Sequence, residues 1–162
     1  MKKILLLILC IYNLAFSNSL GLTNTDLIIL KKIKSLTDDK MMKYTLMAIA
    51  IKESSVGKKQ INFESNDYGL FQSNIKSVIR RQKVPDNMFN RRYFSQKLVY
   101  DVAFSTANAI VEIDFWRKVH KDNWIKIWAS YNTGWKYVSD DGLSYATSVF
   151  DIIKKLKFEY NL

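Results

Sequence analysis

Glu53 is the first residue to consider for chemistry, because it follows a segment that is apolar almost all round. That segment, residues 41–51, predicts a helix buried in the core. At helical spacing the neighbours of Glu53 are Ile49 and Leu46, so its carboxyl group lies at the rim of an apolar stripe. Partial desolvation raises the pKa of a carboxyl group, as a general acid working near neutral pH requires. Taken alone, however, a Glu at a helix end is more often an ordinary solvated residue.

Two later segments change that balance. Residues 66–74 read NDYGLFQSN and residues 128–134 read WASYNTG, while Glu53 itself lies in IKESS. This set resembles the lytic transglycosylase family with the lysozyme-like fold, whose motifs are a Glu-Ser at a helix end, a Gly-Leu-Met-Gln and an Ala-Tyr-Asn-Ala-Gly. The resemblance covers roughly residues 46–149 and is nearest to the small specialised members that accompany secretion, conjugation and invasion systems. Phe71 in place of Met, and Ser-Tyr-Asn-Thr-Gly as the third motif, are small departures.

The resemblance implies a catalytic role for Glu53. It matches the single catalytic acid of the family, which protonates the glycosidic oxygen between N-acetylmuramic acid and N-acetylglucosamine. The same side chain then acts as a base while the 6-hydroxyl of the muramic acid closes a 1,6-anhydro ring. One group can serve both steps because its pKa lies close to the working pH.

Four residues near Glu53 in the motifs are candidates for binding or positioning the substrate. Ser54 matches the Ser that helps to orient the carboxylate, and bonding of its hydroxyl to a helix carbonyl is an equal alternative. Gly69 would let backbone and substrate approach closely, or would simply form a turn. Gln72 matches the Gln that faces the sugar, since its amide offers both a donor and an acceptor. Asp67 either contributes to the site or braces the turn before Gly69, and bracing is the more common role of such an Asp.

Three residues later in the chain complete the predicted site. By resemblance, Tyr131 places its hydroxyl beside the catalytic carboxyl group, and Asn132 supports the loop of the third motif. Tyr145 resembles the Tyr that lines the cleft near the end of the family domain. Without the resemblance, Tyr131 would be interpreted as core packing.

A lysozyme-type muramidase is the alternative reaction. A retaining glycosidase needs a second carboxylate about 5 to 5.5 Å from the acid, and an inverting one about 6.5 to 9.5 Å. Asp67 is the candidate and Glu64 a poorer one, because NDYGLFQ also resembles the strand of animal lysozymes that carries the second carboxylate. The Tyr-Asn-x-Gly motif favours the bacterial transglycosylases. A non-catalytic module that binds peptidoglycan remains a further alternative, against which the presence of Glu53, Gln72 and Tyr131 argues.

Long helices must position these residues, since the chain has five Gly, one Pro and no internal repeat. Periodicity predicts helices at residues 25–36, 41–51, 75–81, 98–119, 123–130 and 144–157. Residues 58–67 are polar and Asn-rich, which fits a loop or a small β-hairpin, and residues 85–87 predict a turn. We therefore expect an α+β, predominantly α-helical, lysozyme-like fold with a small β-hairpin or irregular lobe.

Composition limits the kinds of ligand and partner that this chain is expected to bind. The chain has 162 residues, enough for one domain, and a formal net charge of +10, which points to an anionic partner. One Cys and one His exclude a zinc cluster and a disulfide framework, so we expect no metal and no cofactor. The basic clusters Arg80-Arg81-x-Lys83 and Arg91-Arg92 are interpreted as solvated faces, and no nucleic-acid partner is expected. The resemblance implies peptidoglycan glycan strands as substrate and makes a secretion, conjugation or pilus apparatus a candidate partner.

The first 17 residues predict export. Met1-Lys2-Lys3 is followed by an apolar run from Ile4 to Tyr12 and by small residues at Ala15 and Ser17, which is the layout of a secretory signal peptide. The run is too short for a permanent membrane span. An uncleaved N-terminus is the less favoured alternative, as is lipidation of Cys10. The expected domains are a signal peptide at 1–17 and one transglycosylase domain at 18–162, with a periplasmic or secreted location and a mature net charge of +8.

Overall fold

The computed structural model describes residues 19–162, so the predicted signal peptide lies outside the described residues. Seven α-helices, a short 3-10 helix and three short strands make up this part of the chain. The elements are α2 (Asn24–Lys34), α3 (Lys40–Ser54), β1 (Ile61–Asn62), β2 (Asp67–Tyr68), β3 (Ser73–Asn74), α4 (Ile75–Gln82), α5 (Met88–Tyr100), α6 (Val102–His120), α7 (Trp124–Thr133), η1 (Gly134–Lys136) and α8 (Asp140–Phe158).

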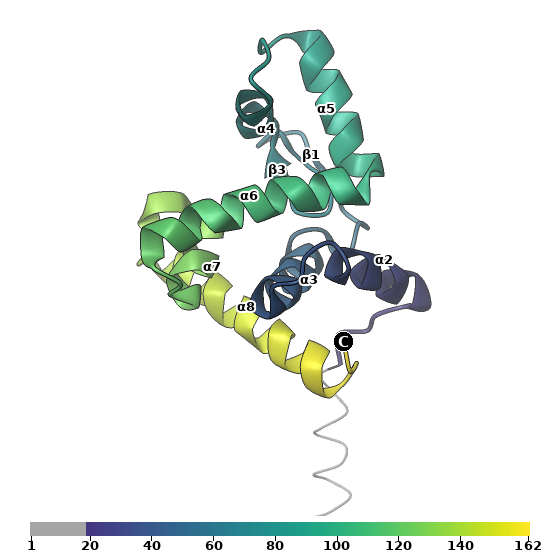
Figure 1. Cartoon of the computed structure of the whole chain (residues 1–162), viewed down its shortest axis with the longest axis vertical. Helices are drawn as coiled ribbons and strands as arrows, with labels where there is room; N and C mark the ends of the chain where they lie inside the picture. The colour runs from purple at the N-terminus through teal and green to yellow at the C-terminus, as the bar shows by residue number, and fades with distance from the viewer. Residues whose placement is uncertain (1–18) are drawn as a thin grey trace, which may run out of the picture.

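Helix α6 crosses the middle of the molecule and separates two lobes (Figure 1). The strands, α4 and α5 lie on one side of it, and α2, α3 and α8 lie on the other. Each lobe has its own cluster of buried apolar side chains. The larger cluster surrounds α3 and includes residues of α7 and α8, whereas the smaller one joins Ile75, Val78 and Ile79 of α4 to Phe94 and Leu98 of α5.

Helix α3 is the buried helix that the apolar run predicts. It begins after Asp39, whose side chain accepts a hydrogen bond from the backbone N–H of Met42 at 2.8 Å, a standard N-cap. Residues 45–50 are all buried, which confirms the expectation for the run around Leu46 and Ile49. The helix ends at Ser54 because Ser55 adopts a left-handed conformation with φ of 52°. Glu53 therefore lies in the last turn of a helix anchored in the core.

The polar segment before Asp67 forms the small β-hairpin that was one of its two expected structures. The three strands make an antiparallel sheet in the order β1-β2-β3. Ile61 pairs with Tyr68, and Asn62 pairs with Asp67, which in turn pairs with Asn74. Because successive residues of a strand point to opposite faces, Asp67 and Tyr68 are directed to different sides of this sheet.

One expected helix is wrong. Residues 98–119 form the end of α5 and most of α6, with a break at Asp101. The Asp101 side chain accepts a hydrogen bond from the N–H of Phe104 at 3.0 Å, which starts a new helix in another direction. The apolar residues keep their helical spacing through the break, because both helices turn an apolar face to the core, and this spacing hides the corner.

The described residues confirm the expected fold class, which is α+β and predominantly α-helical with a small sheet. None of the described helices combines the length and the apolar character needed to cross a membrane.

Candidate active site

The site is built around the carboxyl group of Glu53 at the end of α3. The hydroxyl of Tyr145, from α8, donates a hydrogen bond of 2.5 Å to Glu53 Oε1. This contact joins residues that are 92 positions apart in the sequence. Because Tyr145 is buried and held in place, its hydroxyl fixes the orientation of the carboxyl group. The ammonium group of Lys52 lies 5.9 Å from the centre of the Tyr145 ring, on the outer side of the same helix end.

Burial raises the pKa of Glu53 above its usual value. The hydrogen bond from Tyr145 favours the carboxylate and opposes this shift, whereas the negative charge of Asp67 adds to it. Burial and the neighbouring Glu53 raise the pKa of Tyr145 well above its ordinary value, so its hydroxyl keeps its proton and acts as a donor.

Ser54 lies behind Glu53 and is fully buried. Its hydroxyl contacts the carbonyl oxygen of Leu70 at 2.8 Å and that of Ala50 at 3.1 Å, and it accepts a hydrogen bond from the N–H of Gly57. Bonding to a helix carbonyl was one of the two roles expected for Ser54, and the structure contains it. Ser54 ties the end of α3 to the Gly-Leu-Phe-Gln segment and does not face a cavity.

Gly69 lies very close to another part of the protein backbone, at the end of α5. Its φ is +82°, and a Cβ atom there would lie 2.2 Å from the carbonyl oxygen of Leu98 at the end of α5. This arrangement matches the turn that was the second expected role of Gly69, and an approach of substrate to its backbone stays a prediction. A side chain is excluded because α5 packs directly against this turn, and the turn itself is held by a 2.8 Å bond from the Gly69 N–H to the carbonyl of Gln60.

Gln72 follows in a left-handed conformation with φ of 46°. Its Nε2 donates to the carbonyls of Gly69 at 3.1 Å and Lys59 at 3.3 Å, so the amide nitrogen stabilises the turn. Its Oε1 accepts no hydrogen bond from the described residues, and the side chain lines a cavity. The oxygen is accordingly the part of this amide that can accept a bond from a sugar hydroxyl or an N-acetyl N–H.

Tyr131 of α7 holds the same turn from the other side. Its hydroxyl donates a 2.9 Å hydrogen bond to the carbonyl of Phe71, and burial raises its pKa. By resemblance the hydroxyl of Tyr131 was expected beside the catalytic carboxyl group. The charge of Glu53 does contribute to the raised pKa of Tyr131, but the hydroxyl that contacts Glu53 is that of Tyr145.

Asp67 lies on β2 and is half-buried. Asn74, its partner on β3, donates from Nδ2 to Asp67 Oδ1 at 2.9 Å. This bond gives Asp67 the bracing role that was one of its alternatives. Its charge also acts on Glu53 and on Tyr131, so the carboxyl groups of Asp67 and Glu53 are within electrostatic reach of each other.

Two adjoining groups of residues line separate cavities. Glu53, Tyr145 and Asn132 line one of about 430 Å³, together with residues of α8. Asp67, Gln72 and Tyr131 line the other, of about 310 Å³. Although they line different cavities, Asp67 and Glu53 are close enough for the charge of Asp67 to act on Glu53.

Two charged residues that line the second cavity, Arg81 and Glu112, were not among the site residues predicted from the sequence. Arg81 was interpreted as part of a solvated basic face, but it lines the cavity with Asp67 and forms an ion pair with Glu112 of α6. Glu112 also accepts a 3.0 Å hydrogen bond from Nε1 of Trp116. Glu112 within a largely apolar stretch of α6, four positions before Trp116, was the available signal.

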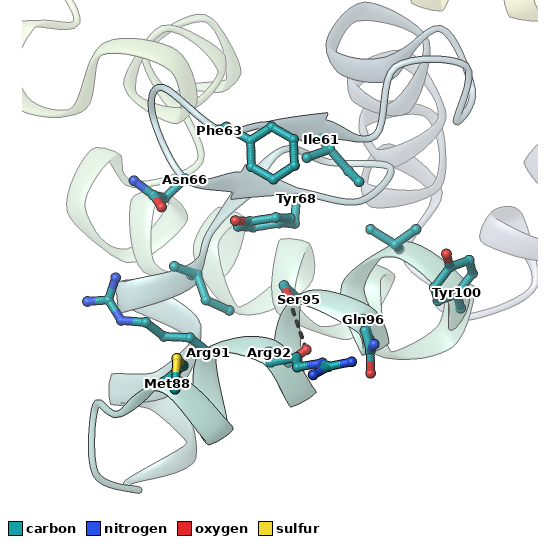
Figure 2. Close-up of a pocket in the computed structure, with 12 residues that line it drawn as sticks. Ile61, Phe63, Asn66, Tyr68, Met88, Arg91, Arg92, Ser95, Gln96 and Tyr100 are labelled. Carbon is teal, nitrogen blue, oxygen red and sulfur yellow. Dashed lines mark hydrogen bonds between the residues drawn. The ribbon is translucent and has the colours of Figure 1, made fainter.

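Metal binding receives no support from the described residues, which contain no group of three or more His, Cys, Asp or Glu placed to hold an ion. The hollow in Figure 2 lies between the sheet and α5 and includes none of the predicted site residues.

Comparison with known proteins agrees with the geometry. The family described as the transglycosylase SLT domain matches residues 32–149, a span that contains every residue of the candidate site. The chain belongs to this family.

One curated relative is an uncharacterised 20.7 kDa protein from the vs-regB intergenic region of enterobacteria phage T4. It is 29% identical over 119 residues, which are 70% of this chain and 62% of the phage protein. The match thus spans less than two thirds of the length of that relative. No solved structure matches the chain at a significant level.

Proposed function

We propose that this protein is a lytic transglycosylase that cleaves the β-1,4 bond between N-acetylmuramic acid and N-acetylglucosamine in peptidoglycan. The observation that carries the proposal is the half-buried carboxyl group of Glu53, which has a raised pKa, lines a cavity and is held by Tyr145. Membership of the transglycosylase SLT domain family supports the same reaction class.

In this reaction Glu53 acts first as the acid. It donates its proton to the glycosidic oxygen, and the bond to the anomeric carbon of the muramic acid breaks. The resulting carboxylate then removes the proton of the 6-hydroxyl while that oxygen bonds to the anomeric carbon, which gives the 1,6-anhydro end. Glu53 recovers its proton, so the cycle consumes no water. Tyr145 holds the carboxyl group in one orientation during both steps.

The neighbouring polar groups suit the recognition of sugars. Gln72 presents its amide oxygen to one cavity, and Asn132 is exposed in the other. We propose that these two side chains contact the hydroxyl and N-acetyl groups of the glycan. Ser54 and Tyr131 act as positioning residues, because their hydroxyls bond the backbone carbonyls of Leu70 and Phe71. Gly69 acts in the same way, because it lets the motif segment pack against the backbone of α5.

A muramidase is the second candidate, and the electrostatic reach between Asp67 and Glu53 is the observation in its favour. In that reaction Asp67 would serve as the second carboxylate, and water would replace the 6-hydroxyl. The hydrogen bond from Asn74 to Asp67 Oδ1 favours a bracing role and hence the transglycosylase.

Digestion of purified sacculi tests the reaction. The soluble muropeptides should carry anhydro ends by mass spectrometry, whereas reducing ends would identify a muramidase. Glu53→Gln should lower the rate by at least about 10³-fold while the variant still binds sacculi, because Gln has no proton to donate. Asp67→Asn is the matched variant. It should keep a measurable rate and the same anhydro product, and complete loss of its activity would favour the muramidase.

Retained activity in Glu53→Gln would remove the assignment of this residue. A wild-type protein that binds sacculi but releases no muropeptides would instead be the non-catalytic binding module.

We further propose that the protein is exported and acts on the wall from the periplasm or after secretion, for local opening or remodelling. Support comes from the signal-peptide pattern in residues 1–17 and from the basic charge of the remaining chain. Detection of a mature N-terminus near residue 18 in an envelope or culture fraction would test it.

A further inference from the structure

A groove of about 390 Å³ lies between the small sheet and helix α5, outside the candidate active site (Figure 2). Ile61, Phe63 and Tyr68 form its wall on the sheet side. Met88, Arg92 and Tyr100 come from α5, along the opposite wall.

The strand register places this groove on the opposite face of the sheet from Asp67. Ile61 and Tyr68 are a cross-strand pair, so their side chains share one face of the sheet. Asn62, Asp67 and Asn74 are paired in the same way and share the other face, where Asp67 and Asn74 line the cavity with Gln72. We therefore expect substitutions of Met88 or Arg92, which lie on α5, to leave the candidate catalytic residues in place.

The rim of the groove is apolar and uncovered. The exposed fractions are 77% for Phe63, 86% for Met88 and 83% for Tyr100. Large apolar side chains that gather around one hollow mark a binding surface more often than a random part of the protein exterior. Tyr, Phe, Met and Arg are also the residue types enriched in protein interfaces, whereas Lys, Glu and Asp are depleted there and none of these three lines the groove.

Basic residues predominate on the α4 and α5 side of the groove. Residues 75–100 contain seven Lys or Arg and a single acidic residue, Asp86. That Asp is already paired with Arg91 through contacts of 2.6 and 2.8 Å. Arg92, which faces the groove from α5, forms no salt bridge with the described residues. A ligand that brings a carboxylate would meet an unneutralised guanidinium beside an apolar surface.

We propose that this groove binds a segment of another protein in which aromatic or aliphatic side chains adjoin Asp or Glu. The apolar side chains would lie between the hairpin and α5, and a carboxylate would pair with Arg92. The concave shape disfavours a membrane as the occupant, because the floor contains Ile75, which is 1% exposed, and a flat lipid surface would leave that floor empty.

Selection of a random dodecapeptide phage library on the purified protein tests the proposal. Enriched peptides should place an acidic residue within a few positions of an aromatic or aliphatic one. Resynthesised with a fluorophore, they should bind with Kd values of order micromolar by fluorescence anisotropy. Met88→Ser and Arg92→Glu should each weaken binding by about tenfold or more. Selection on Arg92→Glu should lose the preference for acidic residues.

Phe158→Ser is the matched control, because Phe158 is 85% exposed on α8 among lysines, and it should bind the peptides like the wild type. Peptides without an acidic preference, peptides that bind Met88→Ser as tightly as the wild type, or no enrichment would overturn the proposal. So would binding to phosphatidylglycerol vesicles that Met88→Ser abolishes, which would assign the surface to a membrane. Digestion of sacculi should be unchanged in Met88→Ser, which alters no charge, so the outcome is independent of the proposed function.

Discussion

Two opposing effects act on the pKa of Glu53. Burial, aided by the charge of Asp67, favours its protonated form, whereas the hydroxyl of Tyr145 favours the carboxylate. An acid that must also act as a base needs both forms within reach, because each proton transfer uses one of them. The Tyr145 contact therefore does more than orient the side chain, since it also limits how far burial raises the pKa.

Tyr145→Phe isolates this contact. Loss of the hydrogen bond should raise the pKa of Glu53 further, so the falling limb of the pH–rate profile, where the acid is deprotonated, should move to higher pH. The rate on sacculi should drop by roughly 10- to 100-fold, as expected for loss of a hydrogen bond to a charged group worth about 1.5–3 kcal/mol. A profile that keeps its falling limb, or moves it to lower pH, would contradict the assigned contact.

Glu53→Gln should also change stability in a pH-dependent way. A carboxyl group whose folded-state pKa is raised supports the folded protein fully below its unfolded pKa, and this support is lost as pH rises through the folded pKa. Gln carries no such penalty. Thermal unfolding should thus show a higher Tm for Glu53→Gln than for the wild type at pH 7, with the difference shrinking toward pH 4. A constant difference would speak against a raised pKa.

At the scale of elements, the Gly-Leu-Phe-Gln turn is held from three directions. Ser54 at the end of α3 bonds the carbonyl of Leu70, and Tyr131 of α7 bonds that of Phe71. Gly69 lies against the end of α5. The turn that carries Gln72 is thereby positioned by three helices, which explains how a sheet of two-residue strands can present a defined side chain.

Gly69→Ala tests the close approach to α5. The new Cβ would meet a backbone carbonyl at 2.2 Å, so something must shift, and we expect a loss of about 3–5 kcal/mol in urea unfolding. Gly134→Ala is the matched control, because Gly134 also has a positive φ, +60°, but nothing within 4 Å of a Cβ atom. It should lose only about 1–3 kcal/mol. Equal losses would mean that backbone strain alone explains Gly69.

At the scale of the whole molecule, the candidate site draws residues from both lobes. Glu53 belongs to the large lobe with α7 and α8, whereas Asp67 and Gln72 belong to the small lobe with the sheet. The basic charge is especially dense on α4 and α5 of the small lobe. Peptidoglycan carries peptide carboxylates, so this charge would attract the protein to the wall.

Ionic strength should reveal that attraction. Binding to sacculi should weaken by about tenfold or more when salt is raised from about 50 mM to 500 mM, because the Debye length then falls below about 10 Å. Binding of an uncharged N-acetylglucosamine oligomer should change little over the same range, since its contacts with the candidate site would be hydrogen bonds. A salt effect of the same size on both ligands would exclude charge on the peptides as the cause.

The sequence by itself determined the buried helix before Glu53, the mostly helical fold class and the three motif segments. These features are local, because apolar periodicity and motif spacing lie within short stretches of chain. Asp101 shows the limit of that reasoning, since its N-cap interrupts a periodic run whose two halves are both buried.

Only the tertiary structure decided which side chains meet at the site. The hydrogen bond from Tyr145 to Glu53 joins residues 92 positions apart. Arg81, which was expected on a solvated face, lines the cavity beside Asp67. The tertiary structure also showed that Gly69 lies directly against the backbone at the end of α5. Such contacts depend on how helices pack across long loops of chain, and residue type and spacing carry little information about that packing.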